Sequence, residues 1–204
     1  DKNMEKKYHR DLEYRLLNGS LSEAEEEDVA SLLKLGVTED YRVVTCYLKT
    51  EKYKDNFTVF QRKKMEVIEK AILDFVPREY IYCNTNQVTY IHKENRTEGK
   101  QDLRKKLEEF QRMIQEQLKE EKSKYEFLIG VGNKVKGYHN LKESFADSKI
   151  AIEYIDVIRK IVGDTNKTVV DCSRLGFFHI FVNIKDKKQL RTYIPDTVHE
   201  IHQY

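Results

Sequence analysis

The run from Phe127 to Ile155, FLIGVGNKVKGYHNLKESFADSKIAIEYI, constrains the fold of this chain more than any other segment. A short apolar segment ends in Gly130-Val131-Gly132, a polar loop follows, and apolar residues recur at helical spacing from Leu141 onward. This pattern is typical of a strand followed by an amphipathic helix. The glycines could begin a dinucleotide fingerprint, but Val135 stands at the third glycine position. We therefore expect a strand end where a helix or a hairpin passes close to the backbone.

Periodicity predicts alternating helices and strands along the whole chain. Helices are expected over Met4–Leu17, Ser22–Gly36, Phe57–Phe75, Gly99–Leu118 and Leu141–Gly163, and from Leu175 onward. Ser22 and Glu25 fit a capping box at the start of the second helix. The third helix is expected to carry Phe60, Val67, Ile68, Ala71 and Ile72 on its apolar face, and the fourth Leu103, Leu107, Phe110, Ile114 and Leu118. Strands are expected over Arg42–Leu48, Glu79–Cys83, Gln87–Lys93, Phe127–Val131 and Thr168–Cys172. The central order strand, helix, hairpin, helix, strand is that of a ferredoxin-like sandwich. We predict an α+β fold with an antiparallel sheet, helices on one face of it, and extra helices at both termini.

Composition and charge exclude several classes of protein. Hydrophobic residues make up 39% of the 204 residues and charged residues 35%, and no stretch is long and apolar enough to span a bilayer. The first ten residues are too charged for a signal peptide, so a cytoplasmic protein is expected. The three cysteines, Cys46, Cys83 and Cys172, lie in strand-like runs and are expected to be buried free thiols. A net charge of only +2 disfavours tight binding to a nucleic-acid backbone.

Motifs in the run from Phe127 to Ile155 are similar to those of a known protein family. Ile129-Gly130-Val131-Gly132 and Ala151-Ile152-Glu153-Tyr154 are similar to the last strand and helix of a GGDEF domain. Leu141-Lys142-Glu143-Ser144-Phe145 resembles more closely the GGDEF-like middle domain of PucR/CdaR-type bacterial transcription regulators. Further similar pieces, in the family's order, are Leu16–Ser20, Leu33–Val37, Tyr41–Val44, Leu175–Phe178 and Leu190–Tyr193. The resemblance covers nearly the whole chain and implies a nucleotide-cyclase-like core.

The resemblance also bears on catalysis. In a diguanylate cyclase, acidic residues from the first strand and the Gly-Gly-Asp-Glu-Phe hairpin hold Mg²⁺ for phosphoryl transfer. The matching positions here, Cys83-Asn84-Thr85-Asn86-Gln87 and Val43–Leu48, contain no carboxylate. We therefore expect no enzyme activity, no catalytic residues, no metal and no cofactor. His199-Glu200-Ile201-His202 spaces two histidines by three, but no third metal ligand is evident.

Alternation along the predicted strands defines a candidate ligand face. It places Val44, Cys46, Leu48, Ile81, Cys83 and Ile91 on the core face of the sheet. The opposite face would carry Thr45, Tyr47, Tyr80, Tyr82, Tyr90 and His92. Such an aromatic surface could stack a planar ligand or a base. The alternative is that terminal helices or a second subunit cover it.

Together these observations predict three segments and a regulatory role. Residues 1–38 form a helical entry segment, 39–173 the GGDEF-like core, and 174–204 a helical segment leading to a helix-turn-helix outside this chain. The expected function is signal relay or dimerisation in a DNA-binding transcription regulator, as a homodimer with a small-molecule effector and no membrane association. The alternatives are a diguanylate-cyclase-like enzyme and an RNA-binding ferredoxin-like module.

Overall fold

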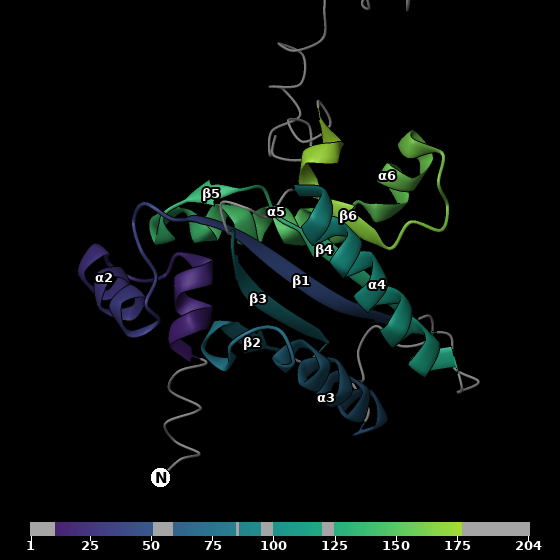
Figure 1. Ribbon diagram of the computed structural model, residues 1–204, viewed down its shortest axis with the longest axis horizontal. Helices are drawn as coiled ribbons and strands as arrows, with labels where there is room; N and C mark the ends of the chain where they lie inside the picture. The colour runs from purple at the N-terminus through teal and green to yellow at the C-terminus, as the bar shows by residue number, and fades with distance from the viewer. Residues whose placement is uncertain (1–10, 51–58, 85, 95–99, 120–124, 177–204) are drawn as a thin grey trace, which may run out of the picture.

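The computed structural model describes residues 11–50, 59–84, 86–94, 100–119 and 125–176 as an α+β fold built on one mixed sheet (Figure 1). The strands are β1 (Asp40–Thr50), β2 (Ile81–Cys83), β3 (Gln87–Lys93), β4 (Tyr125–Val131), β5 (Val135–Lys136) and β6 (Val169–Asp171). The helices are α2 (Glu23–Leu32), α3 (Val59–Leu73), α4 (Lys100–Lys119), α5 (Leu141–Glu153) and α6 (Ile155–Val162), and residues 11–18 are also helical. The predicted fold class is confirmed.

The strand order of the sheet is that of a ferredoxin-like core with additions. The strands lie in the order β2-β3-β1-β4-β6, and the pairs β2–β3, β3–β1 and β1–β4 are antiparallel. The short β5 pairs with the start of β1, and β6 pairs with β4 in parallel. Because α3 connects β1 to β2 and α4 connects β3 to β4, the chain follows the predicted order strand, helix, hairpin, helix, strand.

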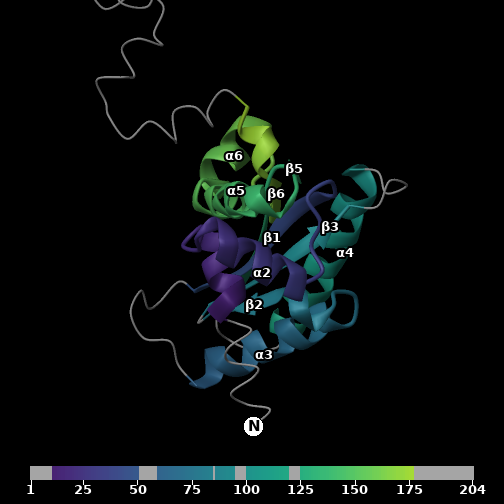
Figure 2. The same ribbon diagram turned by 90° about the vertical axis from the view of Figure 1, so that its left-hand side faces the viewer.

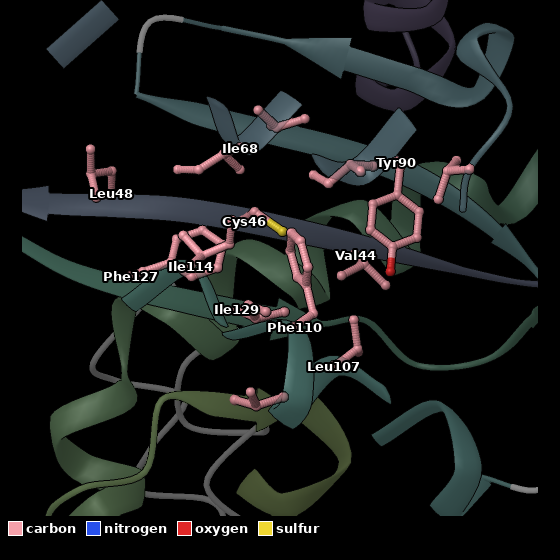
Figure 3. Packing of buried hydrophobic residues seen from close by; sticks show 14 of the residues in the cluster. Val44, Cys46, Leu48, Ile68, Tyr90, Leu107, Phe110, Ile114, Phe127 and Ile129 are labelled. Carbon is pink, nitrogen blue, oxygen red and sulfur yellow. The ribbon is translucent and has the colours of Figure 1, made fainter. Parts of the chain in front are cut away.

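The larger apolar core lies between the sheet and the pair α3 and α4 (Figure 3). Val44, Cys46 and Leu48 of β1 point into it. From α4 it receives all five residues of the predicted stripe: Leu103, Leu107, Phe110, Ile114 and Leu118. On α3, by contrast, Met65 is buried while Val67, which the periodicity placed on the buried face, is 45% exposed.

Helices also cover the second face of the sheet, so the prediction of helices on one face describes only half of the arrangement. Residues 11–18, α2 and α5 pack there on Tyr41 and Val43 of β1 and on Ile91 of β3. Figure 2 shows α2 and α5 on one side of the sheet and α4 on the other. The run from Tyr41 to Cys46 is completely or almost completely buried, as is usual for a strand enclosed on both faces. The described part of the predicted segment 1–38 thus shares a core with the sheet.

Helix α5 lies against β4 at the two glycines of the Gly-x-Gly run. A Cβ atom on Gly130 would stand 2.1 Å from the carbonyl oxygen of Ser148, and one on Gly132 would stand 2.0 Å from that of Ser144. No other amino acid fits a helix backbone this close to a strand. The interpretation of a strand end passed closely by a helix is confirmed.

Of the residues predicted to begin or end a helix, some are confirmed and others are wrong. Ser22 and Glu25 form the predicted capping box at the start of α2, and Gly163 ends α6 in the left-handed conformation. The predicted stop at Gly36 is wrong, because α2 ends at Leu32 and Lys34 takes the left-handed conformation. The single helix predicted over Leu141–Gly163 is broken at Tyr154 into α5 and α6.

Other predictions extend beyond the described residues. The first half of the predicted helix Met4–Leu17 lies outside them, as do residues 177–204 of the predicted C-terminal helical segment. At the start of that segment, Cys172–Leu175 forms a 3₁₀ turn. The boundaries at residues 38 and 173 remain predictions.

The cysteines differ in accessibility, which predicts an order of chemical modification. Cys46 and Cys172 are buried and Cys83 is partly exposed. Burial raises the pKa of the Cys46 thiol, and burial followed by the charge of Asp147 raises the pKa of Cys172 to about 12. Since the thiolate is the reactive form, iodoacetamide at pH 8 should label Cys83 first. Cys46 and Cys172 should react only as the chain unfolds. Mass spectrometry of timed samples would check this, and labelling of Cys46 as fast as Cys83 would contradict it.

Candidate ligand pocket

The predicted ligand face carries five aromatic residues besides Thr45, and these five do not lie on one face of the sheet. Val44 pairs directly with Tyr90 across β1 and β3, and Val43 pairs with Ile91. Directly paired residues point to the same side of an antiparallel sheet, so Tyr90 shares the α3 and α4 side with Val44. Ile91, predicted on the core face, packs instead in the second cluster with Val43. The alternation was assigned one residue out of phase on β3, which moves each of its side chains to the other face.

The positions of the predicted residues follow from this register. Tyr47 and Tyr82 are partly buried on the side of α5 and the N-terminal helices. Tyr90 belongs to the core under α3 and α4, and His92, two residues further along β3, lies on the same side. Tyr80 packs against both clusters at the edge of the sheet. The sheet therefore divides the five residues into two groups.

The group on the α5 side is covered. The ring of Tyr14, in the helical residues 11–18, stacks on Tyr82 with 4.9 Å between ring centroids and 25° between planes. The Thr45 hydroxyl, predicted on the same surface, is buried and shares hydrogen bonds with Thr89 (3.2 Å) and Ser148 of α5 (2.7 Å). Burial, with smaller contributions from Tyr14, Cys83 and Asp11, raises the pKa of Tyr82. These contacts favour the alternative of coverage by helices.

The other group lines a cavity. Tyr80, Tyr90 and His92 face a space of about 830 Å³ between the end of α3, β3 and the first half of α4. A cavity of this size suits a small organic ligand. Its apolar wall is completed by Ala71, Phe75, Val76, Pro77, Ile91, Leu103, Leu107, Phe110 and Met113. Figure 3 shows the rings of Tyr90 and Phe110 from neighbouring elements in this region.

Aromatic rings form the frame of this cavity. Phe75 meets Tyr90 and Phe110 edge to face, with centroid distances of 6.0 and 5.3 Å. Phe75 is nonetheless 52% exposed and Met113 is 46% exposed. Large apolar side chains that stay exposed beside an aromatic cavity often mark a binding surface. Sequence periodicity placed Phe110 on the apolar stripe of its helix and ended the preceding helix at Phe75, and it gave no sign that α3 and α4 leave a gap between them.

Charged residues of both signs also line the cavity. Asp74 and Glu109 provide carboxylates, and Lys93 and Lys106 provide ammonium groups. Lys93 forms an ion pair with Glu39. The cavity therefore suits a planar, mainly apolar molecule that carries a polar group. Among the described residues, no group of His, Cys, Asp or Glu at this place could hold a metal ion.

The hairpin turn between β2 and β3 lies beside the far end of β1. The Leu48 amide donates a hydrogen bond to the carbonyl oxygen of Asn86 (3.1 Å), and Tyr47 pairs with Gln87. The resemblance puts the metal-binding carboxylates of diguanylate cyclases at this meeting point. Here the described side chains are thiol, amide, phenol and aliphatic groups. Across the described ranges no cluster of His, Cys, Asp or Glu could hold a metal ion, and the pair His199 and His202 lies outside those ranges.

Comparisons with known proteins leave the family open. No protein-family model, no curated protein and no solved structure matches the chain. None of the described helices combines the length and the apolar character that crossing a membrane requires.

Proposed function

We propose that this chain is a non-catalytic regulatory domain of a DNA-binding transcription regulator of the PucR/CdaR type, acting in the bacterial cytoplasm. The observation that carries the proposal is the turn between β2 and β3. It lies against the end of β1, where a cyclase would need carboxylates for its metal, and its described residues offer only Cys83, amide side chains and backbone groups. A domain that keeps the cyclase element order without these ligands is better suited to relaying a signal than to phosphoryl transfer.

The cavity offers a means of signal relay. It is lined by α3, β3 and α4, so a ligand inside it contacts elements that are distant in sequence. An effector can shift a regulator only if it binds one arrangement of these elements more tightly than another. In this proposal, a planar apolar effector changes the packing of α3 against α4, and a homodimer passes the change to a helix-turn-helix outside this chain.

The RNA-binding alternative has less support. That function would use an open aromatic sheet face on which bases stack. Tyr82 stacks with Tyr14 instead, and the Thr45 hydroxyl is bonded to α5. The face on which an RNA module would depend is therefore occupied by the protein's own helices.

A charge placed in the cavity tests the effector proposal. Met113→Lys should leave the unliganded melting temperature within a few degrees of wild type, because this side chain is half exposed. It should abolish the rise in melting temperature that a cognate uncharged planar ligand, such as a purine base, produces in the wild-type chain, because the apolar ring would meet an ammonium group in place of an apolar wall. Val157→Lys on α6, at a position of similar exposure away from the cavity, is the matched control.

Two results would contradict the proposal. The first is an equal ligand response in Met113→Lys and wild type, which would place the ligand elsewhere. The second is turnover of a nucleoside triphosphate in the presence of Mg²⁺, measured by product formation, which would favour the cyclase alternative.

A further inference from the structure

A second, basic pocket lies on the other side of two leucines of α4. Leu103 and Leu107 line both the aromatic cavity and a pocket of about 560 Å³ bounded by α4, β4 and β6. Three arginines and one carboxylate line this second pocket, together with Ser173 and apolar side chains. Its charged residues are Arg42, Arg104, Arg174 and Asp171. In Figure 1, α4 crosses beside β4 and β6 at this place.

Arg42 forms a fixed wall of the pocket. It is buried, pairs through Nε with Glu94, and donates through a terminal nitrogen to the carbonyl oxygen of Gly132 (3.0 Å). A buried guanidinium held by a carboxylate and a carbonyl is a structural element. Arg42 therefore has few N–H groups left to bind a ligand.

Arg104 and Arg174 have guanidinium N–H groups that can donate hydrogen bonds to a ligand. Arg104 donates from Nε to Glu108 (2.7 Å), and its terminal nitrogens form no hydrogen bond with the described residues. Arg174, exposed in the 3₁₀ turn Cys172–Leu175, forms no ion pair or hydrogen bond with any of them. A guanidinium presents several N–H groups in a planar fork that matches an oxyanion. Two such groups thus converge on one pocket with unused donors.

Lys167 adds to the excess of positive charge. It is buried, with 8% of its surface exposed, and forms no ion pair with the described carboxylates. Burial, followed by the charges of Arg104 and Arg174, lowers the pKa of Lys167, and the weaker attraction of Asp164 and Glu108 does not offset this. The two arginines therefore repel the charged form of Lys167, and an anion bound beside them would offset this repulsion. Positive charge therefore gathers at this side of the pocket.

We propose that this pocket binds an oxyanion, the phosphate or carboxylate group of a small molecule, through the guanidinium groups of Arg104 and Arg174. The anion would lie between β6 and the first turns of α4. The proposal depends on the charges around this pocket, so it stands whether or not the aromatic cavity binds an effector.

The experiment measures thermal unfolding of the full chain by circular dichroism at constant ionic strength. Sodium phosphate, pyrophosphate and citrate are each compared with sodium chloride. We expect at least one oxyanion to raise the melting temperature by about 3 °C at ten times its Kd. In Arg104→Gln and Arg174→Gln the Kd from calorimetry should weaken about 10-fold or more, because each change removes charge-assisted hydrogen bonds. Arg62→Gln is the matched control, since Arg62 is exposed on α3 and pairs with Glu66 at the same i,i+4 spacing as Arg104 with Glu108.

The anion that stabilises the chain shows whether the ligand group is a phosphate or a carboxylate. Stabilisation by phosphate and pyrophosphate alone assigns a phosphate ligand, and stabilisation by citrate alone assigns a carboxylate ligand. Two results would overturn the proposal: no oxyanion stabilises the chain more than chloride does, or Arg62→Gln weakens binding as much as Arg174→Gln. Because Arg174 is exposed, its variant is expected to fold, so either result is decisive.

Discussion

Replacing Gly132 with alanine is expected to lower the free energy of unfolding by about 3 kcal/mol, at the upper end for an overpacked core position. The new Cβ atom would stand 2.0 Å from the Ser144 carbonyl oxygen and 2.5 Å from its Oγ, so α5 would have to move away from β4. The Ser144 hydroxyl accepts a hydrogen bond from the Val43 amide (2.9 Å) and donates one to the carbonyl oxygen of Asn133 (2.7 Å). A shift of α5 would strain both bonds.

Urea unfolding followed by circular dichroism measures this effect. Gly36→Ala is the control, because the three atoms nearest to a Cβ there belong to the Glu39 side chain, at 3.1 Å or more, so its effect should be small. An unchanged urea midpoint for Gly132→Ala would mean that α5 does not lie on β4 as described.

Replacing Tyr90 with alanine is expected to cost about 3 to 5 kcal/mol of unliganded stability, as for large aromatic residues truncated in a core. The side chain is 1% exposed, packs with Val44, and forms the floor of the aromatic cavity. Urea unfolding without any ligand is the appropriate measurement. Tyr90→Phe keeps the ring and should lose only about 1 kcal/mol. If Tyr90→Ala were nearly as stable as wild type, the ring would be a dispensable ligand surface and not part of the core.

The contrast between Tyr82 and Tyr90 shows where reasoning from single strands reaches its limit. Both were predicted on one amphipathic face, yet Tyr82 stacks on Tyr14 while Tyr90 packs with Val44 on the opposite side. On β3 every residue from Val88 to Ile91 is buried, so hydrophobicity did not distinguish the two faces. Alternation settles orientation only when one face of a strand is exposed. The pairing of β3 with β1 decided it here.

The aromatic cavity shows the same limit for helices. The apolar stripe of α4 was predicted correctly from Leu103 to Leu118, but a stripe indicates only which side of a helix is covered. That Phe75, two residues after the end of α3, meets Phe110 of α4 and still leaves a cavity depends on how the two helices are placed. Their connections to the sheet set that placement.

The sequence by itself determined the class and order of the elements, because periodicity, capping residues and glycine positions act over a few neighbouring residues. It identified the core stripe of α4, the capping box at Ser22 and the close approach at Gly130 and Gly132. Tertiary structure alone decided the coverage of the second sheet face, the side on which Tyr90 and His92 lie, and the convergence of Arg104 with Arg174. These features join residues that are far apart in the sequence, 70 positions for Arg104 and Arg174 and 103 for Thr45 and Ser148, through strand pairing and helix placement. Their energies depend on three-dimensional neighbours that no local pattern specifies.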